Sequence, residues 1–173
     1  MKILLTGGSA CGKSTFAEKL AAEFPPPRTY IATMIPYGDG SEEKVLRHQK
    51  QREGKGFNTL ERYTDLLGVD LPAGGTVLLE CLCNLTANEL FEPNAAGADT
   101  VTAVLAGIEK LAQRTENIIV VTNDVSSDGA SYDKSVMNYI RALGEINKKA
   151  ADMFDCVCEL VCGIPVVLKG ELP

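Results

Sequence analysis

The stretch Gly7–Ser14, which reads GGSACGKS, constrains the fold of this chain more than any other feature. It fits the pattern G-x-x-x-x-G-K-[ST], with an apolar run before it and an amphipathic helical pattern after it. Glycines let backbone N–H groups turn inward around a phosphate, and the N-terminus of the following helix adds partial positive charge. We expect Lys13 to reach the β- and γ-phosphate oxygens of a nucleotide and the Ser14 hydroxyl to coordinate Mg²⁺. A glycine-rich strand–helix turn that matches by chance is the competing interpretation, and the flanking patterns argue against it.

Hydrophobic patterning predicts an α/β domain around this loop. Short apolar runs bounded by Gly, Asp or Asn are typical of parallel strands covered on both faces. The predicted strands are Lys2–Thr6, Thr29–Thr33, Thr76–Glu80, Asn117–Thr122, Cys156–Val161 and Pro165–Leu168. The predicted helices are Lys13–Phe24, Ser41–Arg52, Leu60–Leu67, Leu82–Phe91, Val101–Arg114 and Lys134–Phe154. Because strands and helices alternate, we predict one domain over residues 1–173, with a mostly parallel sheet flanked by helices and a C-terminal β-hairpin.

The charge balance limits the partners of this chain. It carries 17 Lys and Arg against 23 Asp and Glu, whereas a nucleic-acid binder normally shows a broad basic surface. A membrane span would need roughly 18 consecutive apolar residues, and the sequence offers neither such a run nor a signal-peptide pattern. We therefore expect a cytoplasmic protein that binds a small anionic ligand, without nucleic acid and without a membrane span. Its six cysteines are expected to be reduced thiols, and the spacing of Cys81-x-Cys83 and Cys156-x-Cys158 is not that of common zinc sites.

Polar residues at the ends of predicted strands are candidates for the rest of the nucleotide site, because ligands bind beyond the carboxyl ends of strands in open α/β sheets. Glu80 is the first candidate for a carboxylate that accompanies Mg²⁺, and Asp124 is the second. Glu80 could instead cap the helix that follows it. Asn123 and Thr33 also end predicted strands, with simple strand-end hydrogen bonding as the alternative for Thr33.

The only histidine, His48, stands inside the most basic segment of this acidic chain. Arg47, Lys50 and Arg52 surround it, and no acidic residue interrupts Lys44–Arg52. A neutral imidazole leaves one ring nitrogen free to attack phosphorus, and the neighbouring cations could neutralise a triphosphate that is being cleaved. A solvent-facing histidine on a basic helix is the alternative, and the segment by itself does not decide between the two.

Further motifs follow in order along the whole chain. After the phosphate loop come YIAT, the histidine segment, an aromatic-x-Thr-x-Glu pattern that ends at Glu61, LLEC around Glu80, VVTN followed by Asp124, and a closing CGIP. With these motifs the chain resembles the bifunctional adenosylcobinamide kinase / adenosylcobinamide-phosphate guanylyltransferase family of cobalamin biosynthesis. The resemblance implies a RecA-like P-loop NTPase core, a homotrimer, and a corrinoid small molecule as substrate.

The resemblance also implies two successive transfers. ATP or GTP first phosphorylates the aminopropanol hydroxyl of adenosylcobinamide. GTP then transfers GMP to the family histidine, which His48 matches, and the phosphorylated corrinoid takes up the GMP to give adenosylcobinamide-GDP. We accordingly assign catalysis to His48, Lys13 and Glu80, and Mg²⁺ coordination to Ser14 and Glu80. The predicted nucleotide-binding residues are Gly7, Gly8, Ser9, Ala10, Cys11, Gly12, Lys13, Ser14, Thr15, Thr33, Arg47, Arg52, Glu61, Asn123 and Asp124.

The sequence departs from the family pattern close to the phosphates. The family loop usually reads GGARSGKS, whereas Ala10 stands in place of its Arg and Cys11 in place of its first Ser. The replacement of the Arg removes one positive charge near the phosphates. We expect this loss to affect the kinase step more than the guanylyl transfer. One alternative function is a small-molecule kinase without nucleotidyl transfer, in which His48 is dispensable. Another is a non-catalytic GTP-binding switch, against which the chain carries no Asn-Lys-x-Asp guanine-reading motif.

Overall fold

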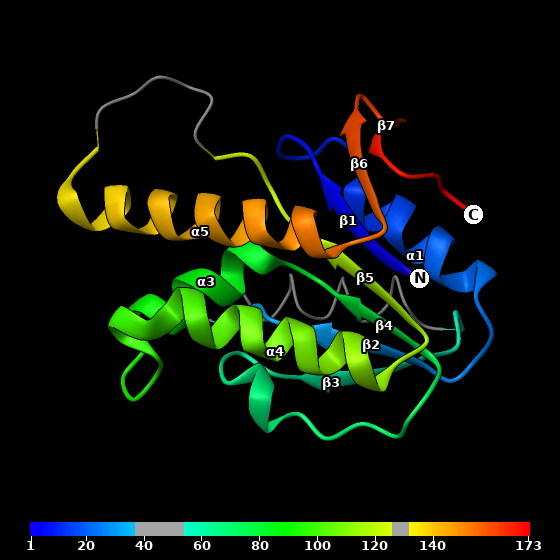
Figure 1. Cartoon of the computed structure of the whole chain (residues 1–173), viewed down its shortest axis with the longest axis horizontal. Helices are drawn as coiled ribbons and strands as arrows, with labels where there is room; N and C mark the ends of the chain where they lie inside the picture. The colour runs from blue at the N-terminus through cyan, green and yellow to red at the C-terminus, as the bar shows by residue number, and fades with distance from the viewer. Residues whose placement is uncertain (37–53, 126–131) are drawn as a thin grey trace.

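The structure, a computed structural model, describes residues 1–36, 54–125 and 132–173. Within these ranges a sheet of strands in the order β3-β2-β4-β5-β1-β6-β7 carries helices on both faces (Figure 1). The strands are β1 (Lys2–Thr6), β2 (Arg28–Ala32), β3 (Phe57–Glu61), β4 (Thr76–Leu79), β5 (Asn117–Val121), β6 (Cys156–Val161) and β7 (Ile164–Lys169). The helices are α1 (Lys13–Glu23), α3 (Leu82–Phe91), α4 (Thr100–Arg114) and α5 (Lys134–Met153), with short 3-10 turns η1 (Leu66–Gly68) and η2 (Gly97–Asp99).

The central strands are buried on both faces. Every residue of β4 and β5 is buried, because α1 covers one face while α3, α4 and α5 cover the other (Figure 1). Ala17 and Leu20 of α1 belong to one cluster of buried side chains. Leu85, Ile108 and Ile146, from α3, α4 and α5, belong to the other. This double cover explains why the central strands read as continuous apolar runs in the sequence.

The predicted fold class is confirmed. Five of the strand pairs run parallel, and β6 and β7 alone form an antiparallel pair within the described sheet. That hairpin turns at Cys162 and Gly163, whose φ angles of 52° and 83° give the left-handed conformation a tight turn requires. Across the described ranges, none of the helices combines the length and the apolar character that crossing a membrane requires. The predicted helix Ser41–Arg52 lies outside the described residues.

The predicted helix Leu60–Leu67 is wrong. Its first residues belong instead to β3, which pairs in parallel with β2 from Phe57 opposite Arg28 to Glu61 opposite Ala32. The Phe57 ring packs edge-on against Tyr30, with 6.1 Å between ring centroids. Asp65 then interrupts the segment with a φ of 51°, and its side chain accepts a hydrogen bond from the Gly68 N–H. Pairing along the edge of the sheet has outweighed the local helical pattern.

Close packing between α4 and η1 yields a stability prediction. A Cβ atom added at Gly107 would lie 2.3 Å from the Leu66 Cβ, so Gly107→Ala forces the two elements apart. We expect the substitution to lower the free energy of unfolding by about 1–3 kcal/mol, measured by denaturant titration.

Gly144→Ala on α5 is the matched control. Nothing lies within 4 Å of a Cβ at that position, and alanine exceeds glycine in helix propensity by about 0.8–1.0 kcal/mol. We expect this variant to be unchanged or slightly stabilised. Equal denaturation midpoints for the two variants would contradict the packing argument.

Candidate active site

The phosphate loop connects β1 to α1 along a path that excludes a side chain at its first residue. Gly7 has a φ of 138°, and a Cβ there would lie 2.5 Å from the backbone oxygen of Leu160 on β6. Gly12 has a φ of 96° and forms the N-cap of α1. Both positions therefore require glycine, the first because of a close approach to the neighbouring strand and the second because of its left-handed backbone.

Lys13 is held inside the curve of this loop. Its side chain is largely buried, and its Nζ donates hydrogen bonds to the backbone oxygens of Gly7 at 2.9 Å and Gly8 at 2.5 Å. The Cys11 Sγ lies 3.7 Å from the same nitrogen. The ammonium group thus lies at the loop expected to surround a phosphate, beside the N-terminus of α1, and both favour an anion.

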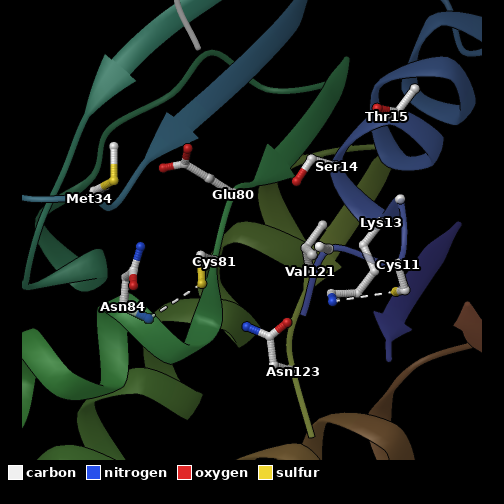
Figure 2. Close-up of a pocket in the computed structure, with 12 residues that line it drawn as sticks. Cys11, Lys13, Ser14, Thr15, Met34, Glu80, Cys81, Asn84, Val121 and Asn123 are labelled. Atoms are coloured by element: carbon white, nitrogen blue, oxygen red, sulfur yellow. Dashed lines mark hydrogen bonds between the residues drawn. The ribbon is translucent and has the colours of Figure 1, made fainter. Parts of the chain in front are cut away.

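A cavity of about 360 Å³ opens beside the loop. Figure 2 shows Ser14 and Thr15, at the start of α1, on one side of it, and Glu80 and Met34 on the other. Val121 at the end of β5, Asn123 just after β5 and Glu80 just after β4 line it as well, because β4 and β5 are neighbours in the sheet and β5 lies beside β1. The lining residues are Ala10, Cys11, Gly12, Lys13, Ser14, Thr15, Met34, Glu80, Cys81, Asn84, Val121 and Asn123.

Glu80 is fixed at the edge of this cavity by the neighbouring strand. One carboxylate oxygen accepts a hydrogen bond from the Tyr30 hydroxyl and the other from the Thr33 N–H, each at 3.0 Å. The alternative role of Glu80 as a helix cap is not what the structure shows, because the Cys81 side chain is the one that caps α3. Glu80 is therefore positioned by β2 and lines the side of the cavity opposite the loop.

The structure places seven of the fifteen predicted nucleotide-binding residues in the lining of the cavity and leaves the other described ones outside that lining. Gly7, Gly8 and Ser9 belong to the loop without lining the cavity. Thr33 is fully buried, and its hydroxyl donates to the backbone oxygen of Cys81. Glu61 ends the edge strand β3 and accepts a hydrogen bond from the Tyr63 hydroxyl. The exposed Asp124 also does not line the cavity. Arg47, His48 and Arg52 lie outside the described residues.

Four lining residues were not predicted. They are Met34, Cys81, Asn84 and Val121. Cys81 directly follows Glu80 and Asn84 stands four positions after it, so the first turn of a helix that begins after a candidate strand end is a signal that would have found them. Met34 and Val121 carry no comparable sequence signal, because their apolar side chains reach the cavity only through the packing of the sheet.

The lining is chemically suited to a magnesium ion held together with a nucleotide. Ser14 and Glu80 both line the cavity and supply a hydroxyl and a carboxylate oxygen, and Mg²⁺ prefers oxygen ligands. Among the described residues no group of three or more His, Cys, Asp or Glu side chains could hold a metal ion. Phosphate oxygens would therefore have to complete the coordination, as is usual for Mg²⁺ in nucleotide sites.

Two thiols lie where α3 begins. Cys83 is only 6% exposed, and its Sγ accepts a hydrogen bond from the Asn123 N–H at 3.3 Å. A hydrogen bond from the Cys81 thiol, helped by the donors at Asn123 and Thr122, lowers the pKa of Cys83 to about 6. The same hydrogen bond and burial raise the pKa of Cys81. Both shifts favour the proton on Cys81 and the negative charge on Cys83.

Sequence comparisons identify relatives over the full length of the chain. A family model described as cobinamide kinase / cobinamide phosphate guanyltransferase matches residues 3–168. The bifunctional adenosylcobalamin biosynthesis protein CobP of Pseudomonas aeruginosa is 30% identical, over 99% of each chain. The bifunctional adenosylcobalamin biosynthesis proteins CobU of Salmonella typhimurium and Escherichia coli are 28% and 27% identical, over 98% of this chain and 100% of theirs.

Solved structures share the fold at much lower identity. A KaiC-like protein from Pyrococcus horikoshii OT3 superposes with a TM-score of 0.50 at 12% identity, over 98% of this chain and 80% of its own. A second protein from the same organism gives a TM-score of 0.50 at 11% identity, over 98% and 86% of the two chains. These similarities support the P-loop α/β fold and carry no information on substrate.

Removal of the Lys13 ammonium group is the direct test of the loop. We expect Lys13→Ala to weaken the binding of a nucleoside triphosphate at least about tenfold, because a hydrogen bond to a charged group contributes about 1.5–3 kcal/mol. Isothermal titration measures the affinity. Lys19→Ala, an exposed lysine on the same helix, is the control and should bind as the wild type does. Equal affinities for all three proteins would contradict a role of Lys13 in nucleotide binding.

The lowered pKa of Cys83 predicts a pH-dependent stability. Between about pH 6 and pH 9 the unfolded chain keeps the Cys83 proton, whose ordinary pKa is 9.0, while the folded chain does not. Stability should therefore rise with pH in this window, by at most about 1.4 kcal/mol per pH unit, and this gain should be lost as pH falls through 6. The measurement is the free energy of unfolding of the wild type minus that of Cys83→Ser, under reducing conditions. A difference that stays constant with pH would contradict the assignment.

Proposed function

This chain belongs to the cobinamide kinase / cobinamide phosphate guanyltransferase family, and on that premise we propose that it catalyses both transfers. The first moves a phosphoryl group from ATP or GTP to the aminopropanol hydroxyl of adenosylcobinamide. The second moves GMP from GTP to the resulting phosphate and yields adenosylcobinamide-GDP and pyrophosphate. The observation that carries the proposal is the cavity in which the phosphate loop with Lys13 faces Glu80 at the ends of β4 and β5.

In the phosphoryl transfer, the loop and α1 bind the phosphate chain. Lys13 supplies positive charge to the β- and γ-phosphates, and the N-terminus of α1 adds to it. Ser14 and Glu80 would hold Mg²⁺, which supplies further counter-charge for the oxygens of the transferred group. The corrinoid hydroxyl attacks the γ-phosphorus and the nucleoside diphosphate leaves. Asn123 lines the same cavity and is proposed to contact the nucleotide there.

In the guanylyl transfer, His48 is proposed as the nucleophile. A neutral imidazole nitrogen attacks the α-phosphorus of GTP, pyrophosphate leaves, and an N–P bond joins GMP to His48. The phosphate of the corrinoid then attacks the same phosphorus and the N–P bond breaks. Arg47 and Arg52 would neutralise the leaving pyrophosphate. A covalent intermediate divides a transfer between two polyanions into two displacements. Thr33, Glu61 and Asp124 are proposed as further nucleotide contacts in one of the two steps.

We extend the proposal to a homotrimer in the cytoplasm. The apolar side chains of β7 are exposed, with Ile164 66% and Leu168 59% exposed to solvent. Burial of this strand against another subunit would remove apolar surface from water, which is consistent with an oligomer. The surplus of acidic residues over basic ones agrees with a small-molecule enzyme that does not bind nucleic acid.

The decisive experiment uses GTP labelled at the α-phosphate. Mixed with Mg²⁺, it should leave acid-labile, base-stable label on the protein and release pyrophosphate, because a phosphoramidate on histidine has this stability. Addition of adenosylcobinamide phosphate should move the label to the corrinoid. His48→Asn should abolish the protein label, whereas transfer of a γ-label to adenosylcobinamide should continue.

The alternatives give different results in the same assays. A small-molecule kinase without nucleotidyl transfer would show γ-transfer to the corrinoid and no α-label on the wild type. A GTP-binding switch would show neither transfer. Retention of the α-label by the His48→Asn variant would contradict a covalent mechanism in which His48 is the nucleophile.

A further inference from the structure

Tyr30 of β2 connects the buried core of the sheet to the cavity. The residue is only 2% exposed and belongs to the cluster of buried side chains that α1 covers. Its hydroxyl donates a hydrogen bond to the Glu80 Oε1 at 3.0 Å. A buried tyrosine hydroxyl usually has a hydrogen-bond partner, and here a partner is a carboxylate that lines the cavity. Tyr30 has no part in the two transfers proposed above.

The register of two neighbouring strands brings these two side chains together. β2 and β4 run parallel with Tyr30 opposite Leu78. Side chains alternate between the two faces of a strand, so Glu80, two positions after Leu78, lies on the same face as Tyr30. The Glu80 N–H donates to the Ile31 oxygen at 3.0 Å, which extends the pairing with β2 to this residue. The tyrosine side chain therefore reaches the carboxylate along the surface of the sheet.

The Tyr30 ring is held by its neighbours. Phe57 of the edge strand β3 packs edge-on against it, with 6.1 Å between ring centroids. A narrow space, with no room for a water molecule, adjoins the ring and is also lined by Ser14 and Glu80, the two residues proposed to hold Mg²⁺. The Tyr30 hydroxyl is thus a fixed donor directly beside the proposed metal ligands.

The second oxygen of the carboxylate is oriented by the same strand. The Thr33 N–H donates to the Glu80 Oε2 at 3.0 Å, and the Asn88 side chain donates to the Thr33 oxygen at 2.9 Å. The two donors on Glu80 use two of the roughly four lone-pair sites of a carboxylate. Accepting these hydrogen bonds is therefore compatible with coordination of an ion.

We propose that Tyr30 is a positioning residue for the divalent ion. By fixing the Glu80 carboxylate, it sets the affinity of the nucleotide-bound site for Mg²⁺. This inference rests on the proposed function, in which Ser14 and Glu80 hold the ion. The terminal torsion of a glutamate side chain is broad, so loss of the tyrosine hydroxyl gives the carboxylate more rotational freedom. Substitution of a residue that hydrogen-bonds a metal ligand typically lowers metal affinity about 10–100-fold.

The test measures Mn²⁺ binding, because Mn²⁺ also prefers oxygen ligands and its free form is quantified by electron paramagnetic resonance. The full-length protein is saturated with α,β-methylene GTP, whose α–β bridge is not cleaved. Tyr30→Phe keeps the ring and should bind Mn²⁺ at least about tenfold more weakly. Its affinity for the nucleotide in the presence of EDTA should equal that of the wild type, because the change acts on the ion and not on the phosphate loop.

Tyr63→Phe is the matched control. The Tyr63 hydroxyl donates to the Glu61 Oε2 at 2.8 Å, which is the same kind of hydrogen bond. Glu61 does not line the cavity and is not a proposed metal ligand. We expect Tyr63→Phe to bind Mn²⁺ as the wild type does.

A double-mutant cycle separates positioning through Glu80 from a general structural effect. Glu80→Ala removes the carboxylate, so adding Tyr30→Phe to this variant should change Mn²⁺ affinity less than about twofold, because residues that act through one interaction are not additive. An unchanged Mn²⁺ affinity in Tyr30→Phe, the same loss in the Glu80→Ala background, or a weaker affinity for the nucleotide in EDTA would overturn the proposal.

Activity assays distinguish this inference from the proposed function. Phosphoryl transfer to adenosylcobinamide by Tyr30→Phe should recover the wild-type rate at saturating Mg²⁺, and a rate that stays low would contradict a role confined to ion binding. If the wild type catalyses neither transfer while Tyr30→Phe weakens Mn²⁺ binding, the positioning role stands and the proposed function falls. Both transfers in the wild type with an unchanged Mn²⁺ affinity in Tyr30→Phe would have the opposite meaning.

Discussion

The phosphate loop depends on a contact between two backbones. Parallel pairing places Thr6, the last residue of β1, opposite Glu159 of β6, so the chain leaves β1 directly beside Leu160. The Leu160 oxygen occupies the space in which a side chain at residue 7 would lie. The loop must therefore begin with glycine. Because Gly7 keeps the loop tight against β6, its backbone oxygen lies within reach of the Lys13 ammonium group, and α1 begins beside the cavity.

The wall of the cavity that faces the phosphate loop is held in place by side chains that connect three elements of the fold. Glu80 at the end of β4 accepts hydrogen bonds from Tyr30 and Thr33, which belong to β2 and to its exit. Asn88 of α3 donates to the backbone oxygens of Thr33 and Tyr63. The carboxylate is thus held by its neighbours before any ligand binds, and such preorganisation lowers the cost of binding and of charge stabilisation.

Features fixed by local pattern could be predicted from the sequence, and features fixed by tertiary pairing could not. The loop, the buried strands and Glu80 follow from glycine positions, apolar runs and a polar residue at a strand end. β3 could not be found, because Leu60 and its neighbours form a strand only by pairing with β2. Met34 and Val121 reach the cavity because the order of the strands in the sheet brings the ends of β2 and β5 to it. Residue spacing in the sequence does not show that order. Thr33 satisfies the interpretation of a strand-end hydrogen bond, and its role as a nucleotide contact stays a prediction.

The size of the cavity bears on how two different acceptors can use it. About 360 Å³ is near the lower end of ligand pockets and suits a phosphate chain with its ion, whereas a corrin macrocycle is far larger. Under the proposed function the corrinoid must therefore remain outside and extend only its aminopropanol arm toward the γ-phosphate. The side away from the loop is bounded by Glu80 and Met34. The first step uses the γ-phosphorus of one nucleotide and the second the α-phosphorus of a fresh GTP, so under the proposed function a single phosphate loop serves both steps in turn.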